Sequence, residues 1–137
     1  MPLDLSSLEK AVFSLKDALN SYIQTAFPGG SKEKEIMRDG VIQRFEYTIE
    51  LSWKMMKRYL EMYGLEKADE FSRKDLIRTS VEQGLIQNAE GWLEYLRNRN
   101  LTSHTYDKAT AEQVYGSAVR FLTDAQYLLE RLKEKNK

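Results

Sequence analysis

Residues 42–60 read IQRFEYTIELSWKMMKRYL, with apolar side chains at every third or fourth position. This spacing is typical of an amphipathic α-helix. The pattern extends from about Glu33 to Tyr63, and Gly64 stands where a C-terminal cap belongs. Gly40 is expected to mark a bend or a close helix contact. The stretch therefore predicts one long helix, whose buried face consists of Ile42, Phe45, Ile49, Trp53, Met56, Leu60 and Tyr63.

Helical patterns before and after this stretch predict four more helices. The first begins with the capping-box pattern Ser6-Ser7-Leu8-Glu9, and its apolar face is expected to comprise Leu8, Val12, Leu15, Leu19 and Ile23. Ser72 is expected to cap a short helix, another helix is expected at about 88–99, and Asp107 is expected to cap the last one. No stretch alternates with period two for long enough to indicate a strand. We therefore predict an all-α, up-and-down four-helix bundle with an additional short helix, forming a single domain over residues 1–137.

The composition restricts the possible functions. Lysine plus arginine and aspartate plus glutamate number 21 each, so a nucleic-acid site must be a local patch. Cysteine is absent, which excludes disulfides and thiolate chemistry and agrees with a reducing compartment. No apolar run approaches the roughly 20 residues that span a bilayer, and the N-terminus lacks the pattern of a signal peptide. We expect a cytoplasmic protein with no membrane partner.

The only histidine, His104, lies in the run RNRNLTSHTYD at residues 97–107. Imidazole gains and loses a proton near neutral pH, and a guanidinium binds phosphate oxygens. On one regular helix, Arg99 and His104 would lie about 140° apart and could not converge on one phosphate. A helix break near Asn100 would let His104 turn back toward Arg99, since asparagine, serine and threonine favour helix ends. Alternatively, the histidine and arginines serve only the helix end.

The run Arg99-x-x-x-x-His104-x-Tyr106 resembles the motif of the HEPN superfamily. Residues 39–46 and 50–54, DGVIQRFE and ELSWK, are similar to the long second helix of its nucleotidyltransferase substrate-binding branch. Trp92-Leu93-Glu94, leading into the run, is similar to the active-site region. The resemblance covers most of the chain and implies a single HEPN-like helical domain, a symmetric homodimer and a minimal nucleotidyltransferase as partner.

The resemblance also implies an activity. Members of the superfamily act as metal-independent ribonucleases, commonly as toxins that the partner neutralises in a toxin–antitoxin pair. In some related pairs the partner adds adenylyl groups to the motif tyrosine, here Tyr106. We take Arg99 and His104 as the expected catalytic residues and Tyr106, Asn100 and Arg97 as expected binding or regulatory residues.

The chemistry of RNA cleavage agrees with these roles. Without a metal, the neighbouring 2′-hydroxyl is the nucleophile, and the reaction needs a base, an acid and a cation. His104 can serve as base or acid, and Arg99 can stabilise the charge. Since one chain has a single histidine, a dimer that brings two motifs together would supply both. Glu46 and Glu50 share a helix face but lack further donors, so we expect no metal and no cofactor.

Two other groups of residues have some features of nucleic-acid or phosphate sites. A basic cluster with Tyr59 and Tyr63 could guide RNA, although a solvated helix face is the favoured interpretation; its members are Lys54, Lys57, Arg58, Arg73 and Lys74. The loop Gly29-Gly30-Ser31-Lys32 lacks the spacing and the preceding strand of a phosphate loop, which excludes that role.

Two functions from different classes remain open, and whether the chain is an enzyme is undecided. In the first, it is a ribonuclease with Arg99 and His104 catalytic across a homodimer. In the second, it is a non-catalytic subunit that binds substrate or nucleotide for a two-component nucleotidyltransferase. RNA or a nucleotide is the expected ligand in either case. A generic helical adaptor is a distant third.

Overall fold

The computed structural model describes residues 3–63 and 67–136 and contains no strand in those ranges. Its α-helices are α1 (Ser6–Gln24), α2 (Lys32–Met62), α3 (Arg73–Glu82), α4 (Ala89–Arg99) and α5 (Lys108–Lys135). Two short 3₁₀ helices, η1 (Ala68–Glu70) and η2 (Thr102–His104), lie in the connections. None of the described helices is long and apolar enough to cross a membrane. The predicted all-α class is confirmed.

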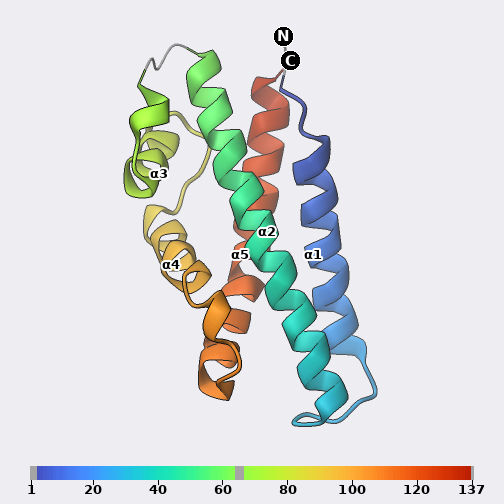
Figure 1. Ribbon diagram of the computed structural model, residues 1–137. Coiled ribbons are helices and arrows are strands. Elements are labelled where there is room, and N and C mark those ends of the chain that lie inside the picture. The colour runs from blue at the N-terminus through green and yellow to red at the C-terminus, as the bar shows by residue number, and fades with distance from the viewer. Residues whose placement is uncertain (1–2, 64–66, 137) are drawn as a thin grey trace.

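Figure 1 shows that α1, α2, α4 and α5 run alternately down and up, with the short α3 beside the upper part of α2. The predicted bundle with an additional short helix is therefore confirmed. The first and last described residues meet at the same end of the bundle. There the Leu3 amide donates to Asn136 Oδ1 at 2.7 Å, and Asn136 Nδ2 donates to the Leu3 carbonyl at 2.9 Å.

An aromatic cluster holds α2, α4 and α5 together in the core. The ring of Phe121 meets Phe45, Trp92 and Tyr95 edge-on, at centroid distances of 5.3, 5.5 and 5.2 Å. Edge-to-face contacts of this kind add stabilisation beyond burial of the rings. Leu8 and Leu15 of α1 complete the core and are fully buried. The packing fixes the end of α4, where the motif begins, against the two longest helices.

Polar side chains cap the later helices, at Ser72 and Asp107 as predicted and also at Asn88. Ser72 Oγ accepts from the Asp75 amide at 3.1 Å, and Asn88 Oδ1 accepts from the Gly91 amide at 3.1 Å. Asp107 caps α5 in the same way. Each bond satisfies an amide that has no partner within its own helix.

Three details of the prediction differ in the structure, and a fourth is not tested by it. The Ser6 capping box is wrong, because Ser6 is already helical and its amide donates to the Asp4 carboxylate at 3.0 Å. Ile23 and Tyr63 are exposed rather than buried, because each lies at the end of its helix, where less of the bundle covers it. Gly40 lies within a continuous α2, and an added Cβ there would meet the side chain of Arg44 at 3.5 Å and no neighbouring helix among the described residues. The predicted cap at Gly64 lies outside the described residues.

Candidate functional site

Helix α4 ends at Arg99, and the predicted break at Asn100 is confirmed. The Asn100 amide still donates to the Leu96 carbonyl, at 3.3 Å, but the Leu101 amide donates to the Asn98 carbonyl at 3.0 Å in a tighter turn. The hydroxyl of Thr102 donates to the Arg99 carbonyl at 2.8 Å. A side chain therefore satisfies a carbonyl that the ended helix leaves without a partner, which stabilises the break.

His104 ends η2, in the short connection between α4 and α5. Its amide donates to the Leu101 carbonyl at 2.9 Å, and its carbonyl accepts from the Asp107 amide at 3.3 Å. Asp107 in turn accepts hydrogen bonds from the Thr110 amide at 3.0 Å and hydroxyl at 2.9 Å. These bonds hold the pKa of Asp107 below its ordinary value. Hydrogen bonds thus hold the backbone on both sides of His104, to Leu101 before it and to Asp107, the N-cap residue of α5, after it.

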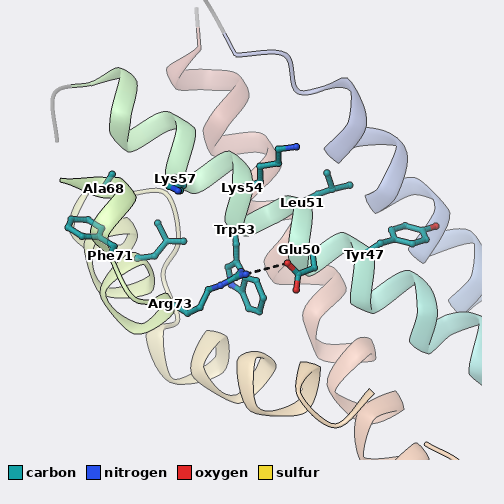
Figure 2. A pocket seen from close by; sticks show the side chains of 10 residues that line it. Tyr47, Glu50, Leu51, Trp53, Lys54, Lys57, Ala68, Phe71 and Arg73 are labelled. Atoms are coloured by element: carbon teal, nitrogen blue, oxygen red, sulfur yellow. Dashed lines mark hydrogen bonds and ion pairs between the residues drawn. The ribbon is translucent and has the colours of Figure 1, made fainter. Parts of the chain in front are cut away.

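The Arg99 guanidinium is directed to α2. Its Nε donates to Glu50 Oε1 at 2.9 Å, and the other carboxylate oxygen of Glu50 pairs with Arg73 Nη2 at 3.4 Å. Figure 2 shows the second of these pairs. The terminal nitrogens of Arg99 have no hydrogen-bond partner in the described part of the chain, and the side chain is 30% exposed. Glu50 therefore orients the guanidinium while leaving its terminal N–H groups available to an anion.

His104 and Tyr106 both lie at the surface. Tyr106 is 86% exposed, and its ring meets the imidazole at a centroid distance of 6.3 Å. Arg97 and Asn100 are exposed as well. Within the described residues, no hydrogen bond joins the side chains of Arg99 and His104. The fold brings Arg99 to Glu50 and His104 to Tyr106, and it leaves all five predicted site residues open to solvent at least in part.

Asn98 is a residue of this region that sequence reasoning missed. It is 3% exposed, and its Oδ1 accepts from Gln113 Nε2 at 2.9 Å. The bond ties the last turn of α4 to α5. An asparagine inside a helical pattern was the available signal, since asparagine is rarely buried without a partner.

A second bond joins the same two helices further from the motif. The hydroxyl of Tyr95 donates to the carboxylate of Asp124. Burial raises the pKa of the Tyr95 phenol, and the Asp124 carboxylate raises it further. The hydrogen bond therefore anchors α4 to α5.

Glu46 and Glu50 share a face of α2 but belong to no metal-binding group of side chains in the described part of the chain. Glu50 instead forms ion pairs with two arginines. In the ranges that the structure describes, no three acidic or histidine side chains are grouped so that they could hold a metal ion. Arg99 and His104 are thus a partly exposed guanidinium and an exposed imidazole on this surface.

Comparison with known proteins finds relatives over nearly the whole chain. Residues 3–134 match the family described as nucleotidyltransferase substrate binding protein like. The probable ribonuclease HepT of Haemophilus influenzae is 35% identical over 140 residues, covering 98% of this chain and 94% of that protein.

Two solved structures share the fold. A Haemophilus influenzae protein, described as revealing the fold of a substrate binding domain of a nucleotidyltransferase, is 35% identical and superimposes with a TM-score of 0.84 over 95% of this chain and 99% of that one. A protein from Thermus thermophilus is 30% identical, with a TM-score of 0.70 over 91% of this chain and 98% of its own. The chain therefore belongs to the nucleotidyltransferase substrate-binding protein-like family, which confirms the resemblance drawn from its motif.

Proposed function

We propose that the protein is a metal-independent ribonuclease that works as the helical partner of a minimal nucleotidyltransferase. Arg99 and His104 are the catalytic residues, in a site composed of both subunits of a homodimer. The observation that carries the proposal is the hydrogen bonding of the Arg99 guanidinium. Its Nε donates to Glu50, while its terminal nitrogens have no hydrogen-bond acceptor among the described residues. The relative named as a probable ribonuclease supports it.

The reaction follows from the groups present. The 2′-hydroxyl of the substrate loses its proton to a base and attacks the adjacent phosphorus. The bond from phosphorus to the 5′-oxygen breaks, and an acid protonates that oxygen, leaving a 2′,3′-cyclic phosphate and a 5′-hydroxyl. Arg99 stabilises the negative charge that develops on the phosphoryl oxygens. His104 transfers the protons, because an imidazole works as base and acid near neutral pH.

A homodimer would supply the second proton-transferring group that the reaction needs. One chain has one histidine, whereas base and acid act on opposite sides of the phosphorus. The exposed position of His104 permits an approach by a second copy around a twofold axis. In the dimer that we propose, one His104 removes the proton of the 2′-hydroxyl and the other protonates the leaving oxygen.

Tyr106 is the proposed point of regulation by the nucleotidyltransferase. Its phenol is 86% exposed and lies beside the imidazole, so a modifying enzyme can reach it. An adenylyl group there would add bulk and a negative charge next to the RNA site. Both effects oppose binding of a polyanion. Arg97 and Asn100, exposed at the same helix end, are proposed to contact RNA phosphates.

The alternative function is a non-catalytic subunit that binds substrate for the nucleotidyltransferase. The description of the solved relative as a substrate-binding domain favours it. The formal net charge of zero also suits a protein partner better than free RNA. The two proposals differ in whether the protein itself cuts RNA.

The deciding experiment incubates the purified protein with labelled RNA in EDTA. Wild type is compared with Arg99→Ala, His104→Ala and, as a matched control, Arg78→Ala on the exposed face of α3. We expect cutting by wild type and Arg78→Ala and none by the two site variants. If no protein cuts RNA while wild type binds the nucleotidyltransferase tightly, the ribonuclease proposal is wrong and the alternative stands.

A further inference from the structure

A cavity of about 640 Å³ lies beside the Arg99–Glu50 pair, between α2, η1 and the start of α3. Its size is that of pockets that hold small ligands. Figure 2 shows its lining, with the Glu50 carboxylate and the Arg73 guanidinium at one side and Phe71 at the other. None of the five residues predicted as the site lines it. The cavity is therefore separate from the motif, and Glu50, which accepts from Arg99, connects the two.

The charge of the lining is positive in a chain of zero net charge. Lys54, Lys57 and Arg73 line the cavity, and Glu50 is the only acidic residue among the described part of its lining. Glu50 is paired with arginines, whereas neither lysine has an ion pair within the described ranges. Two ammonium groups that are left without a protein carboxylate favour an anionic ligand.

The lining also offers flat surfaces for a ring. The Arg73 guanidinium lies over the Trp53 indole, 3.9 Å from the ring centroid, and Trp53 itself is 3% exposed. A guanidinium held in this way presents its other face to a bound base, because bases stack on arginine planes as well as on aromatic rings. Phe71, half-buried at the far wall, is a second stacking surface.

We propose that this cavity binds a nucleotide of the RNA substrate outside the bond that is cut. The base stacks on Arg73 and Phe71, and the phosphate is held by Lys54 and Lys57. This inference rests on the proposed ribonuclease function. An RNA strand is the favoured ligand because Arg73 and Arg99 bind the same carboxylate, so the cavity begins next to the guanidinium that contacts the scissile phosphate.

The test measures RNA binding separately from cleavage. A His104→Ala protein, which does not cut, is titrated with a fluorescent single-stranded oligoribonucleotide over a range of salt concentrations. Adding Lys54→Gln and Lys57→Gln to this protein should weaken binding about tenfold or more and reduce the slope of log Kd against log salt by about 0.7 for each lysine. The matched control is Lys10→Gln with Lys16→Gln on α1, which removes the same charge at exposed positions outside the cavity.

Two further variants separate stacking from charge. Arg73→Lys keeps the positive charge but loses the planar surface, so it should weaken binding roughly fivefold with an unchanged salt slope. Lys54→Arg with Lys57→Arg should bind like the parent protein. The melting temperature of each variant shows whether it is folded.

The outcomes distinguish this site from the ribonuclease function. If RNA is cut but the lysine pair and its α1 control bind equally, the cavity proposal is wrong and the ribonuclease stands. If RNA is not cut but binding depends on the cavity lysines, the ribonuclease is wrong and the binding site stands. If the cavity variants lose binding to the nucleotidyltransferase and not to RNA, the cavity is a protein-docking surface, which overturns the proposal.

Discussion

At the scale of single residues, Glu50 is the side chain that orients the proposed catalytic guanidinium. It accepts from Arg99 Nε at 2.9 Å and, through its second oxygen, from Arg73 Nη2 at 3.4 Å. Both arginines are partly exposed, so the ion pairs contribute little to stability. Their effect is on geometry, because a carboxylate that holds Nε restricts the rotation of the guanidinium plane.

This role predicts the effect of Glu50→Ala on RNA cleavage. The Arg99 side chain loses its orientation but keeps its charge, so we expect kcat to fall roughly 10-fold to 100-fold. The pH profile should keep its shape, because His104 is unchanged. Steady-state kinetics measure both quantities. Glu46→Ala, one turn away on α2, is the control and should stay near wild type. Equal losses in the two variants would show that Glu50 has no special position.

At the scale of elements, the connection between α4 and α5 depends on side chains that satisfy helix ends. Thr102 covers the end of α4, and Asp107 covers the start of α5, with His104 between them. Asn98 adds a buried bond from α4 to Gln113 of α5. The imidazole is therefore exposed on a backbone that hydrogen bonds hold on both sides, and such a restricted position would lower the entropic cost of the proposed catalytic role.

The Asp107 cap predicts a pH dependence of stability. The Thr110 amide and hydroxyl hold the pKa of Asp107 below its ordinary value of 3.8 in the folded protein. A lowered folded pKa means that the carboxylate stabilises the fold above the unfolded value, and that this stabilisation disappears as the pH falls through the folded pKa. The loss is therefore confined to acid below about pH 4.

Asp107→Asn tests this dependence, because an asparagine can cap the helix but does not titrate. Urea unfolding at about pH 6 and about pH 3 should show a smaller acid-induced loss of stability in Asp107→Asn than in wild type. Asp17→Asn, an exposed aspartate within α1, serves as the control and should behave like wild type. An unchanged acid loss in Asp107→Asn would mean that the cap does not contribute through its charge.

At the scale of the whole molecule, the bundle presents His104 and Tyr106 outward while it buries the aromatic cluster around Phe121. A composite site with two histidines makes the two subunits of the proposed dimer depend on each other. A site within one subunit would not.

Heterodimers of wild type and His104→Ala test this dependence. The two chains are given different tags, and the mixed dimer is purified through both. We expect its cleavage rate to fall close to that of the His104→Ala homodimer, since one of the two proton-transferring groups is missing. A rate near half of wild type would indicate two independent sites. The heterodimer with Arg78→Ala should cut at the full rate.

The sequence by itself determined the helices, the caps at Ser72 and Asp107 and the position of the motif. Periodicity and capping are local properties, so residues within about four positions decide them. The caps at Ser72 and Asp107 therefore form as predicted, and Asn88 stands at the predicted start of its helix. Helix α4 ends at the predicted break. Ile23 and Tyr63 were assigned wrongly because burial depends on how far neighbouring helices extend, which their own periodicity does not show.

Only the tertiary structure decided which side chains meet. Glu50 and Arg99 are 49 positions apart, and Asn98 and Gln113 belong to different helices. The cavity lined by Lys54, Lys57 and Arg73 exists because η1 and α3 fold back against α2. The physical reason is that a hydrogen bond, an ion pair or a cavity depends on distances between segments. Those distances are set by packing of the whole bundle, and a pattern within one segment carries no information about them.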